Sequence, residues 1–144
     1  MPAAPPARGG PGPTRRPSGW ARWRARRVEV RDESMAPTLR PGDRLRVDTR
    51  SYRDASPRVG DIVVLVDPEL PGRWLIKRIA AVGPGTYAGP GDTTPTPVPD
   101  RTVFVVGDAR GTSRDSRHFG PLPFERVLGR AVERYAPVAR RGPL

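Results

Sequence analysis

Lys77 is the only lysine among the 26 lysine and arginine residues of the chain. Its segment, RWLIKRIAAV (73–82), has the residue pattern of a β-strand, in which Leu75, Lys77 and Ile79 share one face while Arg78 lies on the other. Burial lowers the pKa of a lysine amine toward neutrality, whereas arginine stays protonated. The position therefore suits a group that must lose its proton, and we interpret it as a general base; the alternative is a chance lysine codon.

A neutral lysine needs a nucleophile to activate, and the composition narrows the choice. The chain has no cysteine and a single histidine, His118, which excludes thiol nucleophiles, disulfides and multi-histidine metal sites. Serine paired with lysine is a known catalytic solution. Ser34 is the candidate, because Pro37 favours a tight turn or the first turn of a helix that would expose a hydroxyl and a backbone N–H. The alternative is that Ser34 is only a capping or turn residue.

Three segments together resemble one protease family. SMAPTL (34–39) resembles the nucleophile box of the signal peptidase I-like, S26-type serine proteases, and LIKRI (75–79) resembles their general-base box. VVGDARGTSRDSRHFGPLP (105–123) is similar to their third conserved block. The boxes occur in the family's order and the resemblance covers roughly residues 28–135. Within the family, the chain is most like the proteases that mature nickel-type superoxide dismutase, because it is small, shows no preceding membrane anchor and has an actinobacterial type of composition.

The resemblance implies a role for each matching position. Ser34 would be the nucleophile and Lys77 the general base of a Ser-Lys dyad. Ser113 would hydrogen-bond the lysine amine and orient it, while Asp115 and Arg117 would form a buried ion pair that braces this loop. The backbone N–H of the nucleophile would form part of the oxyanion hole, and no metal or cofactor is implied.

Other positions near the boxes carry their own expectations. Met35 and Pro37 support the nucleophile box. Asp32 stands two residues before the nucleophile, where the family has Gly or a hydroxyl residue; a carboxylate would repel an oxyanion, so we expect Asp32 to point away or the hole to rely on backbone. Ala109 replaces the asparagine usual after Gly-Asp. His118 stands where the family has an aromatic ring, and we expect it to pack or face solvent.

The elements that must position these residues are mostly strands. The apolar patterns predict strands at 28–30, 42–48, 60–67, 73–82 and 102–108, and a strand or helix at 126–135. Segment 83–100 is rich in Gly and Pro and is expected to be a long loop. The predicted fold is mainly β, the compact β domain of signal peptidases and self-cleaving repressors, spanning residues 28–144.

The basic charge is concentrated at the start of the chain. The formal charge is +11, and residues 1–27 hold seven arginines and no acidic residue. This Pro/Gly-rich segment is expected to be a disordered leader. Trp20, Trp23 and the neighbouring arginines would give either a peripheral membrane contact or packing onto the domain. With no apolar run of roughly 20 residues, we expect a cytoplasmic protein without a transmembrane segment; the alternative is membrane association.

The functional prediction is a serine endopeptidase that removes an N-terminal propeptide from a protein substrate, most specifically from a nickel-type superoxide dismutase precursor. The first alternative is a type I signal peptidase that cleaves exported preproteins at the membrane. The second is a non-catalytic basic module that binds nucleic acid, although no nucleic-acid partner is expected because the charge lies mainly in the leader. A self-cleaving repressor is disfavoured, because 27 Pro/Arg-rich residues cannot form a helix-turn-helix.

Overall fold

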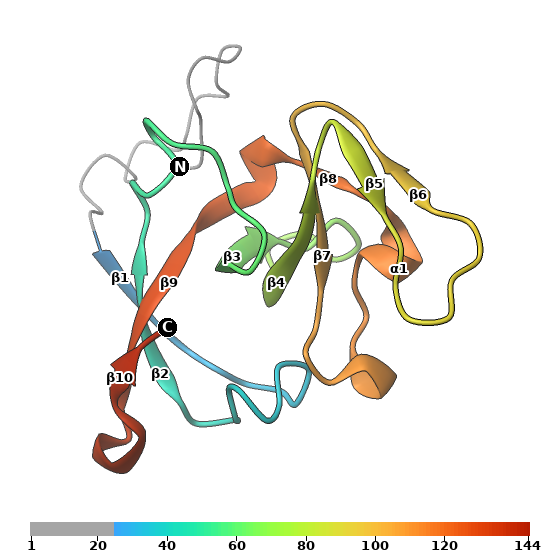
Figure 1. The fold of residues 1–144 in the computed structure, drawn as a ribbon. Coiled ribbons are helices and arrows are strands. Elements are labelled where there is room, and N and C mark those ends of the chain that lie inside the picture. Colours follow the sequence, from blue (N-terminus) through green and yellow to red (C-terminus); the bar gives the residue numbers. More distant parts are fainter. Residues whose placement is uncertain (1–24) are drawn as a thin grey trace.

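The structure is a computed structural model that describes residues 25–144. Most of the predicted leader, including Trp20 and Trp23, lies outside the described residues. The strands are β1 (Ala25–Glu29), β2 (Arg44–Asp48), β3 (Ile62–Val66), β4 (Trp74–Val82), β5 (Gly85–Tyr87), β6 (Thr96–Val98), β7 (Thr102–Val106), β8 (Leu122–Pro123), β9 (Val127–Ala136) and β10 (Gly142–Pro143). A short helix, α1 (Ser116–Phe119), and 3₁₀ turns at Arg110–Thr112, Phe124–Arg126 and Val138–Arg140 complete the elements (Figure 1).

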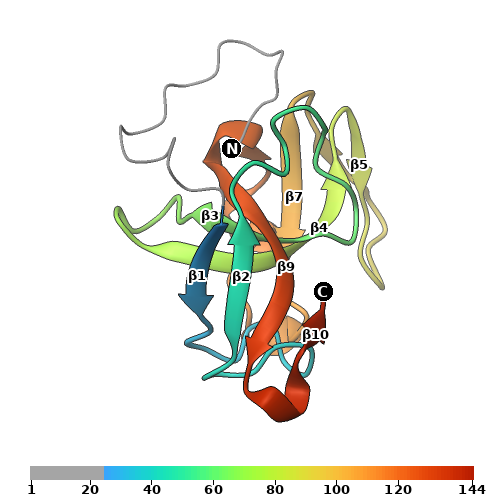
Figure 2. The ribbon, with the colours of Figure 1, turned by 90° about the vertical axis from the view of Figure 1, so that its left-hand side faces the viewer.

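One antiparallel sheet dominates the domain. Its strands are ordered β1-β2-β9-β3-β4-β7-β8, with β10 added to β9, while β5 and β6 form a separate hairpin. In Figure 2, β1, β2 and β9 run upright while β3 and β4 run across them, so the sheet is strongly coiled. The prediction of a mainly β fold is confirmed, and the segment that could have been strand or helix is the strand β9.

Two parts of the sequence prediction need correction. β1 begins at Ala25, so residues 25–27, which the sequence predicts to be part of the leader, belong to the sheet. Segment 83–100 is not a loop without regular structure, because it contains the β5–β6 hairpin. These strands are only three residues long and contain Gly85 and Pro97, so no alternation is visible in the sequence.

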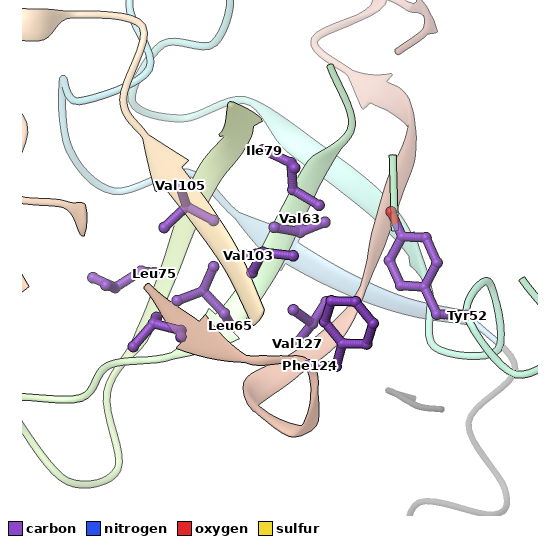
Figure 3. Close-up of a cluster of buried hydrophobic side chains, with 10 residues drawn as sticks. Tyr52, Val63, Leu65, Leu75, Ile79, Val103, Val105, Phe124 and Val127 are labelled. Atoms are coloured by element: carbon purple, nitrogen blue, oxygen red, sulfur yellow. The ribbon is translucent and has the colours of Figure 1, made fainter. Parts of the chain in front are cut away.

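The core lies on both sides of β3. Val63 and Leu65 pack into one cluster, with Leu75, Ile79 and other apolar side chains from β4, β7 and β9 (Figure 3). Ile62 and Val64 point into the second cluster, which also holds the side chains of residues 35, 39, 45 and 47. The strand is therefore buried on both faces, as its continuous apolar run predicts.

Candidate active site

Ser34 opens a tight turn between β1 and β2. The Leu39 N–H donates to the Met35 carbonyl at 2.9 Å, and both of these side chains are buried in the second core cluster. Pro37 lies exposed at the outside of the turn. Met35 and Leu39 thus anchor the turn, and Ser34 lies at its edge with 8% of its surface exposed.

Asp43 fastens the far end of this turn to the C-terminal part of the chain. Its carboxylate is buried and accepts the Arg40 N–H at 2.9 Å and the Arg140 guanidinium at 2.5 Å. Arg134 donates to the Thr38 carbonyl at 2.8 Å. Guanidinium–oxygen contacts of this kind are charge-assisted and therefore strong, so β9 and the turn after it help to fix the segment that carries Ser34.

Lys77 lies on the buried face of β4, as the alternation predicts. Only 3% of its surface is exposed, and Leu75 and Ile79 are buried on either side of it. Its Nζ donates to Ser113 Oγ at 3.0 Å. Burial lowers the pKa of Lys77, and the charges of Asp32 and Asp115 oppose this only in part. The neutral amine is therefore accessible at a lower pH than in an exposed lysine.

A buried carboxylate supports the serine that holds Lys77. Ser113 Oγ donates to Asp115 Oδ2 at 2.6 Å, and Arg117 pairs with both carboxylate oxygens, with Nε at 2.9 Å from Oδ1 and Nη2 at 2.8 Å from Oδ2. Asp115 also caps α1 and accepts the Gly107 N–H at 2.8 Å. Burial alone would raise the pKa of Asp115, but these donors lower it far below the usual range. The structure thus brings together Lys77, Ser113, Asp115 and Arg117.

The segment Gly107–Ala109 holds the turn of residues 34–39, called here the nucleophile turn after the role predicted for Ser34, against this cluster. The Ala109 N–H donates to the Ser34 carbonyl at 2.9 Å. A Cβ on Gly107 would lie 2.2 Å from Ser113 Oγ and 2.5 Å from the Ser34 carbonyl oxygen. Glycine is therefore required for this close approach. The contact of Ala109 is made by its backbone, so the missing asparagine side chain does not remove it.

Asp108 also lies at the site, although the sequence patterns predict no role for it. Its carboxylate accepts the Thr38 hydroxyl at 2.6 Å and both Nε (2.9 Å) and Nη2 (2.8 Å) of Arg78. Arg78 lies on the opposite face of β4 from Lys77, as predicted, but it is half-buried and paired. The Gly-Asp pair after β7 was visible in the sequence; its partners became evident only when the fold placed β4 and the nucleophile turn beside it.

Asp32 does not lie as expected. Its Oδ1 accepts the backbone N–H of Ser34 at 3.0 Å, so the carboxylate points toward the proposed oxyanion donor. Burial raises the pKa of Asp32, but interactions with Ser34 and the charges of Lys77 and Arg73 outweigh this and lower it overall. The reason is local geometry, because a carboxylate readily accepts the N–H two residues on.

His118 takes a local structural position. Its Nδ1 accepts the Asp115 N–H at 3.2 Å and completes the cap of α1, and its side chain is 43% exposed. This agrees with the expected packing or surface role.

Two hollows meet at Ser34 and Lys77. The larger, about 530 Å³, runs between β1 and the start of β4, and the smaller, about 310 Å³, is walled by parts of segments 67–75 and 112–119. Asp32, Ser34, Leu75 and Lys77 line both. At the larger hollow, the Arg26 guanidinium lies 4.7 Å from the centroid of the Trp74 ring, which joins the walls formed by β1 and β4. An extended peptide that passes from one hollow to the other would run past Ser34 and Lys77.

The chain matches the family described as signal peptidase, peptidase S26, over residues 23–87 and 85–136. It is 36% identical to a probable signal peptidase I-1 of Synechocystis sp. over 143 aligned positions, which cover 80% of this chain and 73% of that protein. It is 40% identical over 118 positions to mitochondrial ATP-independent inner membrane protease subunit 1b of Arabidopsis thaliana, covering 77% of this chain and 70% of that subunit.

A third relative is longer. Thylakoidal processing peptidase 1 of Arabidopsis thaliana is 32% identical over 142 positions, which cover 74% of this chain but 41% of that peptidase. In the part of this chain that the structure describes, no helix is long and apolar enough to cross a membrane. The family match extends over the nucleophile turn, β4 and the Ser113 cluster, and the chain belongs to the S26 signal peptidase family of serine endopeptidases.

Proposed function

We propose that this endopeptidase removes N-terminal signal or leader peptides from precursor proteins, with Ser34 as nucleophile and Lys77 as general base. The observation that carries the proposal is the buried Lys77 amine, held by Ser113 beside the hollow that Ser34 also lines. The names of the relatives, signal peptidase, inner membrane protease and processing peptidase, support this substrate class better than the narrower superoxide dismutase reading.

The chemistry proposed for the pair is acyl transfer. Neutral Lys77 takes the proton of the Ser34 hydroxyl, and Ser34 Oγ forms a bond to the scissile carbonyl carbon. The Ser34 N–H donates to the oxyanion that develops. The protonated amine then gives its proton to the leaving nitrogen as the C–N bond breaks. Water attacks the acyl-enzyme in the same way, and Ser34 is regenerated.

The edges of two strands suit an extended substrate. β1 pairs with β2 on one side, and its other edge has no partner strand among residues 25–144. β7 pairs with β4 only from Arg78 onward, which leaves the opposite edge of residues 74–77 free of a strand partner within the same range. Both edges line the larger hollow. A peptide could add to either edge through main-chain hydrogen bonds, with its scissile bond at Ser34.

The nickel-type superoxide dismutase precursor is the second candidate substrate. It is favoured by one observation, the arginine-rich and nearly lysine-free composition that resembles that subgroup. The two candidates differ in the sequence before the scissile bond, so a direct comparison of precursors separates them.

Intact-mass analysis tests the function. Wild type, Ser34→Ala and Lys77→Arg are each incubated with a preprotein that carries an apolar stretch and an Ala-x-Ala site, and with a propeptide-bearing superoxide dismutase precursor. We expect wild type and the exposed-serine control Ser56→Ala to cleave the preprotein at one bond, and both site variants to leave it intact. Cleavage of the dismutase precursor alone would favour the second candidate. Processing by Lys77→Arg would show that the neutral amine is not the base.

The cellular location is a separate proposal: the cytoplasm, with membrane association as the alternative. Fractionation of cells that express the full chain tests it. Recovery in the carbonate-resistant membrane pellet would replace the first location by the second.

A further inference from the structure

Asp32 contacts the group that the proposed mechanism requires. Its carboxylate accepts the Ser34 N–H at 3.0 Å, and the mechanism assigns this same N–H to the developing oxyanion. A backbone N–H has one proton to donate. The Asp32 carboxylate already accepts this proton in a charge-assisted hydrogen bond, so a neutral substrate carbonyl must compete with it for the same donor.

The carboxylate cannot stay in place during the reaction. The oxyanion would carry its negative charge at the position toward which the Ser34 N–H points, where the Asp32 carboxylate already lies. Two negative charges at hydrogen-bond distance from one donor repel each other. Asp32 is exposed and lies where the two hollows meet. Its side chain can therefore move without opening the core, and a peptide in the hollows would approach it directly.

The charges around Asp32 link this movement to Lys77. The positive charges of Lys77 and Arg73 stabilise the carboxylate, and Asp32 in turn raises the pKa of Lys77 against the larger effect of burial. Other charged groups also lie near Asp32. Its sequence neighbours are Arg31 and Glu33; the smaller hollow adds Asp67, Glu69 and Arg114, and the larger hollow adds Arg26, Arg27 and Glu29. Asp115 and Arg117 act on Lys77 from the side of the Ser113 cluster.

We propose that Asp32 is a positioning residue that restrains the nucleophile: in the free enzyme its carboxylate holds the Ser34 N–H, and a substrate carbonyl reaches that donor only by displacing the carboxylate. The inference rests on the proposed roles of Ser34 and Lys77. Displacement has two effects, since it frees the oxyanion donor and moves a negative charge away from the Lys77 amine. Binding of a well-fitting peptide is thereby coupled to activation of the base, and peptides that fill the hollows poorly are cleaved slowly.

Three variants separate the contact from the charge. Asp32→Ala removes both, Asp32→Asn keeps an oxygen acceptor but removes the charge, and Asp32→Ser supplies a hydroxyl that can itself donate. Asp48→Ala is the matched control, because Asp48 Oδ1 accepts the Arg50 N–H at 2.8 Å in the same local arrangement and lines neither hollow. The measurement is kcat/KM against pH, on a synthetic peptide with an Ala-x-Ala site and on the same peptide shortened before that site.

The expected result is a plateau kcat/KM roughly 10- to 150-fold above wild type for Asp32→Ala and Asp32→Ser, the fold-change that corresponds to breaking a charge-assisted hydrogen bond. The gain should be larger on the shortened peptide, which has less binding energy to displace the carboxylate. The acidic limb of the profile should move to lower pH in all three Asp32 variants, because each removes the charge that raises the pKa of Lys77. Asp48→Ala should match wild type.

A plateau at or below wild type in both Asp32→Ala and Asp32→Ser overturns the inference, even if the acidic limb moves. Circular dichroism of each variant shows that its fold is retained, and Asp32→Ser reports on the contact if Asp32→Ala does not fold. Failure of the underlying mechanism looks different, because Ser34→Ala or Lys77→Arg would then still cleave the peptide.

Discussion

Lys77 and Arg78 are neighbours with opposite electrostatic requirements. Lys77 is buried between aliphatic side chains, which lowers the pKa of its amine, while pairing with Asp108 raises the pKa of Arg78. β-strand geometry sends the two side chains to opposite faces. One face therefore holds an ammonium group that can lose its proton, and the other holds a permanent charge that fixes Asp108.

The lowered pKa of Lys77 predicts the pH dependence of cleavage. Because only the neutral amine accepts the Ser34 proton, kcat/KM should rise with pH as Lys77 deprotonates and level off below the pKa of an ordinary lysine, about 10.4. Lys77→Arg should lower kcat by roughly 10³-fold or more at every pH, since arginine stays protonated. A pH–rate profile of both proteins checks this. An acidic limb at the ordinary lysine value would contradict the role of burial.

Asp115 should contribute stability that depends on pH. Its folded-state pKa is depressed, so the contribution is complete above the unfolded value near 3.9 and is lost as pH falls below it. Asp115→Asn should lower the free energy of unfolding by roughly 2–4 kcal/mol at pH 7, because Arg117 loses its charged partner and one of the two acceptor oxygens is replaced by an NH2 donor.

Urea unfolding of wild type and Asp115→Asn between pH 7 and pH 2 measures this difference. It should narrow by up to about 1.4 kcal/mol per pH unit below pH 4. A constant difference over that range would mean that the carboxylate charge is not what stabilises the loop.

At the scale of elements, the site depends on one close approach between the end of β7 and the nucleophile turn. Gly107 touches both the Ser113 side chain and the Ser34 carbonyl, and Ala109 holds that carbonyl. The distance between Ser34 and Ser113, the proposed nucleophile and the residue proposed to orient Lys77, is therefore set by backbone packing, and neither side chain has to hold the other.

Gly107→Ala should separate the two segments. The added methyl group meets the Ser34 backbone and Ser113 at distances that packing cannot absorb, and a displacement of about 1 Å costs on the order of 100-fold in rate. Gly111→Ala is the matched control, because a Cβ there meets nothing within 4 Å. The measurement is kcat/KM for both variants, with thermal unfolding to confirm the fold. Equal activity of the two variants would show that the close approach is not required.

The main elements of the fold could be predicted from the sequence because each follows a simple periodicity. The continuous run in β3 and the alternation around Lys77 predict burial correctly. The β5–β6 hairpin and α1 have three- and four-residue elements, too short to show a period. The contacts of Asp108 and Asp32 depend on long-range packing and on a side-chain rotamer, and a linear pattern carries neither. The resemblance predicts the site residues, and the fold shows which of them contact one another.

At the scale of the whole molecule, unbalanced positive charge is concentrated at the start of the sequence. Residues 1–24, which precede β1, carry five arginines without an acidic residue, whereas charged side chains of the domain pair with one another, as Arg46 does with Glu133 and Arg114 with Glu69. Exposed pairs of this kind contribute little stability. The unbalanced charge at the start of the chain is thus the part suited to an acidic surface.

Deletion of residues 1–24 should therefore affect binding to surfaces more than catalysis. We expect kcat/KM on a soluble peptide to stay within about twofold of the full chain, because residues 25–144 contain the two hollows and both members of the proposed dyad. The affinity for anionic phosphatidylserine vesicles, measured by co-sedimentation at 50 mM salt, should fall by more than about 10-fold, since the deletion removes five arginines and each arginine near such a surface contributes about 1 kcal/mol. Neutral vesicles are the control. Unchanged sedimentation of the shortened chain would assign any membrane contact to the domain.

The contact between Arg26 and Trp74 gives residues 25–144 an intrinsic fluorescence probe of peptide binding. Trp74 is the only indole in residues 25–144, it is 37% exposed, and it joins β1 to β4 at the larger hollow. A peptide that enters between these strands must change the polarity around that ring and its contact with the guanidinium. Fluorescence emission excited at the indole should then follow occupancy of the hollow in real time, with Ser34→Ala, which we expect to bind peptide without cleaving it, as the receptor and no label attached.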